Sequence, residues 1–150
     1  MDLINLSDGN NSVRLHLLGR HRPGILPEHD LMDAEIIVDS DFISGRFLVH
    51  FFLSDLKPWS LALHSLENGQ NAEWLDMGNG PTIRIECAGS DDDDSIVFIE
   101  DTSGSGTTAI IPIALDPGWV QAQREHLNEA VKTWPMEVVK TSPGSYEWKS

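Results

Sequence analysis

Apolar and polar residues alternate near the start of the chain, which is the spacing expected of a half-buried β-strand. Val13, Leu15 and Leu17 fall on one side of this segment, with polar side chains between them. The other strands predicted in the first third of the chain lie at residues 4–6, 34–38 and 42–52. Residues 19–33 are polar and are interrupted by prolines, so they are predicted to form a long ordered loop.

Two later segments carry apolar residues at intervals of three and four, the spacing of an amphipathic helix. The first spans residues 55–67, with Ser54 as its predicted N-cap. The second spans residues 117–134, with Asp116 as its predicted N-cap. Pro117 suits the first turn, because the backbone amides there have no hydrogen-bond partner within the helix and proline lacks this amide hydrogen. The apolar stripes of the two predicted helices comprise Leu56, Trp59, Leu63 and Leu66 in the first, and Val120, Leu127, Val131 and Trp134 in the second.

Three segments in the second half of the chain are apolar on both faces, as in strands that are covered on two sides. Residues 82–88 and 95–101 are predicted to form a hairpin, and residues 107–115 return as a further strand. Pro112 lacks an amide donor, which predicts an edge position or a bulge at that point. The tail is strand-like only at Val138 and Val139.

These elements predict an α+β fold in one globular domain of residues 1–150. Two amphipathic helices are expected to pack on an antiparallel sheet of about seven strands, curled or split into two layers. Alternating strand–helix–strand units are missing from the pattern, which argues against a parallel sheet.

The charge of the chain is unevenly distributed, with a formal net charge of −14 and most of the excess between residues 67 and 101. Such a surface repels nucleic acid and anionic lipid and attracts basic proteins, so we expect neither a nucleic-acid nor a membrane partner. The acids predicted to contact a basic protein are Glu73, Asp76, Asp91, Asp92, Asp93, Asp94, Glu100 and Asp101. The run of four aspartates lacks the spacing and the glycine of a calcium loop, which predicts a solvated hairpin loop without a bound metal.

The N-terminus has acids where a secretory signal has bases, and no apolar run is long enough to span a membrane. Cys87 is the single cysteine, so no internal disulfide can form. A cytoplasmic location is therefore expected, with no prediction of oligomeric state. Cys87 is in phase with Ile83 and Ile85, which predicts a core position.

The candidate chemistry is sparse, because no pair of histidines has helical metal-ligand spacing and no nucleophile elbow is present. Neither a metal nor a cofactor is expected, and the chain is not predicted to be an enzyme. An alternative is a ligand-binding or catalytic loop that uses Arg20, His21, His29 and Asp30. The simpler interpretation pairs an arginine of this loop with an acid such as Asp33 or Glu35.

Five tryptophans could serve as stacking platforms, but Trp59 and Trp134 lie on the predicted core stripes. Trp74, Trp119 and Trp148 therefore remain as candidates for exposed or interfacial positions.

Several short motifs resemble an uncharacterised family of small actinobacterial proteins. The resemblance rests on Leu18-Gly19-Arg20 with Pro23-Gly24, on His29-Asp30 with Ala34-Glu35, on Asp55-Leu56 with Trp59, and on Trp134-Pro135-Met136-Glu137 with Tyr146-Glu147-Trp148. It implies no activity and no catalytic residue. The order of strands, helix, strands and closing helix is also similar to the WapI-type immunity proteins, which neutralise secreted toxins.

The leading hypothesis is a non-enzymatic, acidic protein-binding module, with an immunity protein that masks a basic toxin as its most specific form. Two alternatives stay open. One is the small-ligand or enzymatic loop at residues 20–30, and the other is a soluble domain of unknown role whose acidity keeps it in solution.

Overall fold

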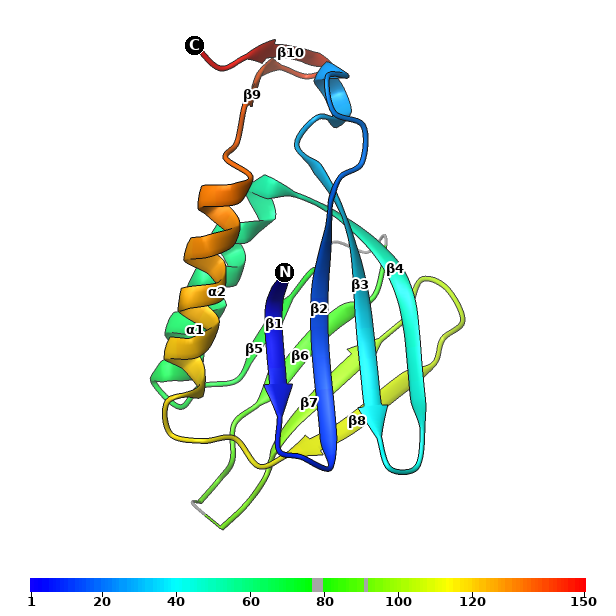
Figure 1. Cartoon of the computed structure of the whole chain (residues 1–150), viewed down its shortest axis with the longest axis vertical. Helices are drawn as coiled ribbons and strands as arrows, with labels where there is room; N and C mark the ends of the chain where they lie inside the picture. The colour runs from blue at the N-terminus through cyan, green and yellow to red at the C-terminus, as the bar shows by residue number, and fades with distance from the viewer. Residues whose placement is uncertain (77–79, 91) are drawn as a thin grey trace.

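The computed structural model describes residues 1–76, 80–90 and 92–150, and its elements form two four-stranded sheets, a two-stranded hairpin and two α-helices (Figure 1). The first sheet, in the order β1-β2-β3-β4, consists of β1 (Asp2–Ser7), β2 (Asn11–Arg20), β3 (Leu31–Ser40) and β4 (Ser44–Phe52). The second, in the order β5-β6-β7-β8, consists of β5 (Ala72–Trp74), β6 (Thr82–Glu86), β7 (Ser95–Glu100) and β8 (Thr108–Ile113). The helices are α1 (Leu56–Glu67) and α2 (Trp119–Thr133), and the hairpin pairs β9 (Val138–Ser142) with β10 (Ser145–Trp148).

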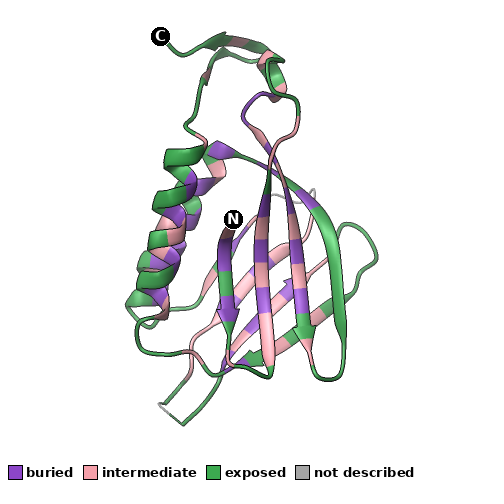
Figure 2. Ribbon diagram, in the orientation of Figure 1, coloured by how far each residue is buried: buried purple, intermediate pink, exposed green. Residues whose placement is uncertain are grey.

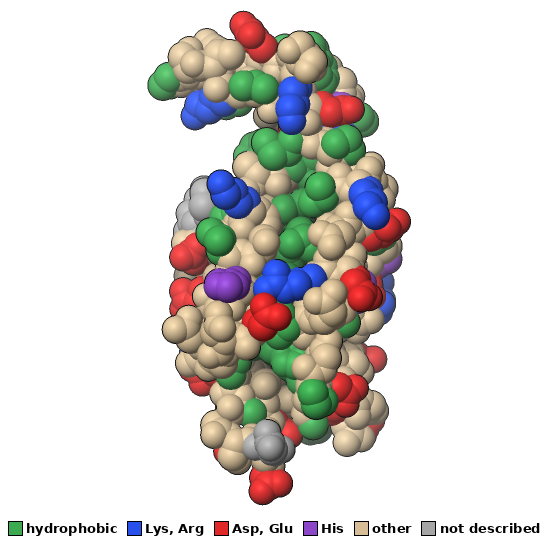
Figure 3. Space-filling view, turned by 90° about the vertical axis from the view of Figure 1, so that its left-hand side faces the viewer, with side chains coloured by type: hydrophobic (Ala, Val, Ile, Leu, Met, Phe, Trp, Pro, Cys, Tyr) green, Lys and Arg blue, Asp and Glu red, His purple; other side chains and the backbone are tan. Residues whose placement is uncertain are grey.

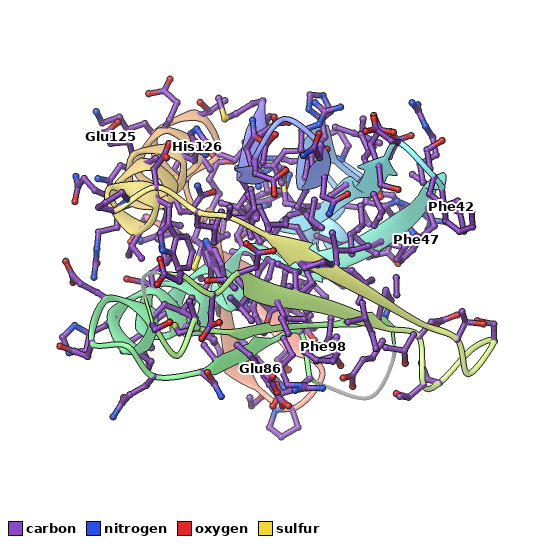
Figure 4. The ribbon with its side chains drawn as sticks, turned by 90° about the horizontal axis from the view of Figure 1, so that it is seen from below. Phe42, Phe47, Glu86, Phe98, Glu125 and His126 are labelled. Atoms are coloured by element: carbon purple, nitrogen blue, oxygen red, sulfur yellow. The ribbon has the colours of Figure 1, made fainter. Side chains whose placement is uncertain are left out.

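The α+β class, the antiparallel pairing and the two helices are as predicted. The single sheet of about seven strands is wrong, because the strands divide into sheets of four, four and two. After β4 the chain enters α1 instead of a hairpin, and the strands that follow build a second layer facing the first (Figures 1 and 4). Among the described strands, neighbours in the sequence pair within each layer, and none pairs between the two layers.

The core lies between the two four-stranded sheets, where alternate residues of each strand point inward (Figure 2). Inward side chains with exposures below a tenth include Met32, Ala34, Ile36 and Val38 of β3, Ile83 and Ile85 of β6, and Val97 and Ile99 of β7. The prediction that β8 is covered on both faces is wrong, because Ile110 is 59% exposed. Pro112 lies in β8 at an edge of its sheet, as predicted.

Helix α1 agrees with its predicted range, and its four stripe residues are buried. Ser54 is not the N-cap, because a short 3₁₀ turn, η2 (Leu53–Asp55), precedes the helix and makes Asp55 the cap. In α2 the stripe is shifted: Val131 is exposed and Trp134 only half-buried, whereas Gln123 and Ala130 are buried. The sequence pattern missed Gln123 because a polar residue carries no apolar signal.

Gln123 joins α2 to the outer edge of β1. Its side-chain Oε1 accepts a hydrogen bond from the Asn5 amide at 2.8 Å, and its Nε2 donates to the Asn5 carbonyl at 3.1 Å. The side-chain amide thus pairs with this backbone as a neighbouring strand would, and the edge of β1 is closed by a helix. The opposite edge strand of the same sheet, β4, has no such cover among the described elements.

The predicted loop at residues 19–33 is shorter in the structure, because β2 continues to Arg20 and β3 begins at Leu31. Between them lies a single 3₁₀ turn, η1 (Leu26–Glu28). The β2–β3 register shifts between Leu17 and Gly19, so β2 contains a bulge at this point. Arg20 is thereby placed opposite the inward-facing Met32.

The β9–β10 hairpin lies at one end of the molecule, above the ends of β2 and α2 (Figure 1). The sequence predicted a strand only at Val138 and Val139, but the strand extends to Ser142 and turns back at Gly144, whose φ of 78° favours glycine. None of the described helices is long and apolar enough to cross a membrane.

Candidate functional site

The outer face of the second sheet gathers three of its acids around one base. Arg84 on β6 lies opposite Glu73 of β5 and opposite Phe98 of β7. Its guanidinium group forms ion pairs with Glu86, with Glu100 at 2.9 Å and with Glu73 at 3.8 Å. It also lies over the Phe98 ring, 3.7 Å from the centroid. Glu86 and Phe98 project from the same side of the molecule (Figure 4).

Three carboxylates around one guanidinium group leave this face with an excess of negative charge. The hydrogen bond from Arg84 to Glu100, together with the charges of Glu100 and Glu86, raises the pKa of Arg84. Arg84, like any arginine, is charged at neutral pH and offsets part of the charge of each carboxylate. The side chains of Glu73 and Glu86 are nevertheless 50% and 37% exposed. We call Glu73, Arg84, Glu86, Phe98 and Glu100 the acidic face.

The β6–β7 loop adds further acids next to this face. Asp92, Asp93 and Asp94 are exposed, and Asp93 accepts a hydrogen bond from Ser90 Oγ at 3.1 Å. Asp93, Asp94 and Glu86 line one open hollow of about 370 Å³, which connects the loop to the acidic face. The predicted contact residue Asp91 lies outside the described residues.

The two remaining predicted contact residues stand apart from this group. Asp101 accepts hydrogen bonds from the backbone amide and the hydroxyl of Ser105, both at 2.9 Å, and these bonds lower its pKa. It therefore holds the turn that precedes β8. Asp76 is exposed beyond the end of β5, next to Leu75, which has a positive φ of 64°.

The structure brings together three of the four residues of the alternative loop site. Arg20 donates to Asp30 at 2.5 Å and to the His29 carbonyl at 3.0 Å. His21 points elsewhere, to Asp33 on the outer surface of the first sheet. The predicted internal pairing of an arginine of this loop with an acid is confirmed for Arg20. Its partner is Asp30 and not Asp33 or Glu35, because the bulge turns the Arg20 side chain inward.

Arg20, His29 and Asp30 are occupied by the C-terminal segment. Arg20 donates to the Pro135 carbonyl at 2.7 Å, and His29 Nε2 lies 2.5 Å from Glu137 Oε2. Asp30 accepts from the amides of Glu137 and Val138, at 3.0 and 2.9 Å. These contacts, which we call the C-terminal clasp, hold the start of the β9–β10 hairpin.

The cavity beside the clasp has about 310 Å³ and is lined by one of the four loop residues, Asp30. The other lining residues are mostly apolar and include Leu26, Phe52, Met136 and Tyr146. Because the polar atoms of Arg20 and Asp30 bind protein groups, the arrangement positions a hairpin and offers little to a ligand.

An apolar surface that was not predicted runs along β4 and the turn before it. Phe42 is 90% exposed and Leu48 60% exposed, and Ile43, Phe47 and Phe52 are exposed as well. Phe42 and Phe47 project from the rim of the molecule (Figure 4). Apolar residues on both faces of a strand are also typical of a central strand, so the sequence pattern did not identify this exposed edge.

A second apolar surface runs between the two helices. Hydrophobic side chains gather along the middle of the helical side of the molecule (Figure 3). Part of this band is a groove of about 480 Å³ lined by Leu56, Leu127, Val131, Trp134 and Met136, with Lys57 and Lys149 also contributing.

Comparison with known proteins adds a family without an assigned role. Residues 1–135 match the model of a family of unknown function, DUF5959. No curated protein and no solved structure matches the chain. The matched region ends at Pro135, whose carbonyl accepts the first hydrogen bond of the C-terminal clasp, from Arg20.

Proposed function

The chain belongs to DUF5959, a family of unknown function, and we propose that it is a non-enzymatic module that binds a basic protein. The acidic face carries this proposal, because three carboxylates share one arginine beside the exposed acids Asp92, Asp93 and Asp94. A surface with this excess charge, centred on a partly exposed aromatic ring, is complementary to lysine and arginine side chains of a partner.

An acidic face of this kind mainly increases the rate at which the protein associates with a basic partner. Opposite charges steer two proteins together over about one Debye length, roughly 8–10 Å at physiological salt. A nuclease presents cationic residues to phosphate, so an acidic module could cover that surface quickly. The most specific form of the proposal is therefore an immunity protein that masks a basic toxin, of the kind to which the WapI-type proteins belong.

The apolar edge at β4 supports protein binding as the general class of function. Its exposed aromatic and aliphatic side chains lie on an edge strand, and such edges pair with extended segments of other chains. The ligand-binding alternative at residues 20–30 has weaker support, because the clasp uses its polar atoms within the protein.

The test compares two double variants that remove the same number of charges. Glu73→Gln/Glu86→Gln changes the acidic face, whereas Glu125→Gln/Glu129→Gln changes exposed glutamates on α2, on a different side of the molecule (Figure 4). Each protein is immobilised and incubated with native lysate at low and at high salt. We expect basic proteins to be captured at low salt by the wild type and the α2 variant, and to be depleted by the acidic-face variant.

Equal depletion by both double variants would reduce the effect to net charge and would contradict a specific face. Stopped-flow association with a recovered partner then separates steering from contact. Replacing Asp92, Asp93 and Asp94 with asparagine should slow association and flatten its salt dependence, with a smaller effect on dissociation.

A further inference from the structure

Two histidines and an aspartate from separate segments converge on the outer surface of the first sheet. Asp33 of β3 is paired directly with His50 of β4, so their side chains leave the same face of the sheet. His21 follows the end of β2, and its amide donates to the Leu31 carbonyl at 2.8 Å. One ligand atom from each of the three residues lies within 4.8 Å of the other two.

The bulge in β2 creates this convergence. It places Gly19 opposite Asp33, so no side chain of β2 stands directly over the carboxylate. It also turns Arg20 inward, so that the next residue, His21, lies on the outer surface. Without the bulge the two positions would exchange faces, and an arginine would stand in place of the imidazole.

Both imidazoles lie within hydrogen-bond distance of the same carboxylate oxygen. His21 Nδ1 lies 2.8 Å from Asp33 Oδ1, and His50 Nδ1 lies 2.6 Å from the same atom. The two rings meet edge to face, with their centroids 5.1 Å apart. Within the described residues, neither lysine nor arginine forms an ion pair with Asp33, so its negative charge is available to a cation.

We propose that His21, Asp33 and His50 bind a divalent transition-metal ion of the zinc class. Two imidazole nitrogens and one carboxylate oxygen suit zinc, nickel, copper or iron, whereas magnesium and calcium prefer oxygen ligands alone. Three protein ligands leave a coordination position open, as in zinc sites that bind water or a substrate.

The distances require only a small adjustment. Zinc binds nitrogen and oxygen at about 2.0–2.2 Å, so tetrahedral ligand atoms are separated by roughly 3.3 Å. The Nδ1 atoms of His21 and His50 therefore have to move about 0.5 and 0.7 Å away from Asp33 Oδ1, starting from 2.8 and 2.6 Å. The two nitrogens, which lie within 4.8 Å of each other, have to approach a similar separation. The side chains of His21, Asp33 and His50 are 32%, 29% and 48% exposed, which allows such a movement without disturbing the core.

His50 also connects the cluster to an apolar cavity. It lines a space of about 270 Å³ at the β4 edge, together with Leu48, Phe52, Leu75 and Pro81. A metal with an open position at this place would adjoin apolar surface that can accommodate part of a bound molecule. This site is independent of the acidic face, which lies on the second sheet.

The structure supplies a matched control. His16 Nδ1 lies 2.8 Å from Asp2 Oδ1, the same separation as in the His21–Asp33 pair. That carboxylate is shared with Arg14, 3.6 Å away, in place of a second imidazole. A histidine–aspartate pair with a cation already beside it should not hold a metal.

The experiment titrates Zn²⁺ into untagged, metal-free protein by calorimetry, with chelator competition for tight binding. We expect one saturable site, weakened at least about tenfold in His21→Ala, His50→Ala and Asp33→Asn, and unchanged within about twofold in His16→Ala. Far-UV circular dichroism checks that each variant is folded. A wild type without a saturable site, or cluster variants that bind zinc as the wild type does, would overturn the proposal.

Titration with Co²⁺ adds a readout of geometry. Four-coordinate Co²⁺ gives intense visible bands, whereas a loosely bound hexahydrate gives weak ones. We expect intense bands in the wild type and in His16→Ala, and their loss in His50→Ala. Weak bands in every protein would assign the binding to adventitious surface contact and reject the cluster as a metal site.

Discussion

At the scale of single residues, Trp74 shows why burial cannot be assigned from a short segment. The sequence left it among the candidates for an exposed position, but it is 2% exposed and packs against Phe51 and Trp59, with ring centroids 5.4 and 5.3 Å away. Its Nε1 donates to the Asp55 carbonyl at 2.8 Å. The three-residue strand β5 is too short to show an alternating pattern, so this position carried no signal.

Trp74→Phe should destabilise the protein by about 1–2 kcal/mol in the free energy of unfolding. The phenyl ring keeps most of the packing, but the Asp55 carbonyl loses its indole donor in a partly buried place. Denaturant unfolding measures the change. Trp148→Phe is the control, because Trp148 is 48% exposed and should change stability by less than about 0.5 kcal/mol. Equal losses in the two variants would contradict the role of the hydrogen bond.

Cys87 should react slowly with a thiol reagent in the folded protein. It is half-buried just beyond β6, short of the fully buried core position that was predicted, and its Sγ lies 3.4 Å from the Gln70 carbonyl. Burial raises the pKa of the thiol, so the reactive thiolate is scarce near neutral pH. Labelling rates in native and denatured protein test this. Native labelling as fast as in denaturant would show that the thiol is freely accessible.

Asp8→Asn should lower stability at neutral pH and lose this effect in acid. Asp8 accepts from the Ala114 amide at 3.0 Å and from those of Asn11 and Asn10, and these bonds lower its pKa below 3.8. A lowered folded-state pKa means that the stabilisation is present above the unfolded value and is lost as pH falls through the folded value. The free energy of unfolding at neutral pH should fall by roughly 0.5–1.5 kcal/mol, with the lower end expected because Asp8 is accessible to solvent.

Unfolding curves of wild type and Asp8→Asn between neutral pH and strongly acidic pH provide the measurement. The two curves should converge as the wild-type carboxylate protonates. Asp41→Asn, at an exposed turn position, is the control and should be neutral throughout. A constant difference between wild type and Asp8→Asn at every pH would assign the effect to shape and not to charge.

At the scale of elements, the sequence predicted the strand β2 but not the consequences of the bulge within it. The alternation of Val13, Leu15 and Leu17 predicted the strand, and the structure confirms it. One extra residue, however, reverses the faces of everything that follows. Gly19, with a φ of 141°, is compatible with a bulge, but a glycine alone does not fix the register beyond it. Both the C-terminal clasp and the histidine–aspartate cluster depend on this reversal. Pair spacing along the chain could not reveal either group.

Asp30→Asn should loosen the β9–β10 hairpin while the sheets keep their protection. The substitution removes the charge opposite Arg20 and one acceptor for the Glu137 and Val138 amides. Loss of a charge-assisted hydrogen bond costs about 1.5–3 kcal/mol, so amides of β9 and β10 should exchange about ten to a hundred times faster. Hydrogen exchange with peptide resolution measures this.

Asp33→Asn is the matched control for Asp30→Asn, since it neutralises a neighbouring acid on the outer surface of the sheet. It should leave exchange in the hairpin unchanged. Faster exchange throughout β6 and β7 in Asp30→Asn would contradict a local role, because it would show that the clasp stabilises the whole fold.

At the scale of the whole molecule, local patterns predicted the class of fold but left open whether its strands form one curled sheet or divide into layers. Both helices and most strands follow from nearby residues, although β5 and β10 were not predicted. The choice of one sheet or two depends on contacts between distant parts of the chain. The exposed apolar edge at β4 was hidden for the same reason. A strand at residues 42–52 with apolar side chains on both faces is typical of a central strand, and only the assembled sheet shows that it lies at an edge.

The net charge of −14 predicts how stability responds to salt. Acids outnumber lysine and arginine by 24 to 10, so repulsion in the folded protein exceeds the attraction in its ion pairs. Raising NaCl from low concentration to about 0.5 M shortens the Debye length to a few ångströms and screens repulsion and attraction alike. Because repulsion is the stronger of the two, the free energy of unfolding should rise, by about 1 kcal/mol.

The variant in which Asp92, Asp93 and Asp94 become asparagine tests where this repulsion is concentrated. These side chains are exposed and adjacent, and the ion pairs of Arg84 involve other residues, so the variant loses repulsion without losing an attractive contact to Arg84. It should equal or exceed the wild type in stability at low salt, by up to about 0.5 kcal/mol, and gain less from NaCl. Glu125→Gln/Glu129→Gln should respond to salt almost as the wild type does. If NaCl lowered the stability of the wild type, the ion pairs would outweigh the repulsion, and the acidic loop would be a stabilising element of the fold and not a surface free for a partner.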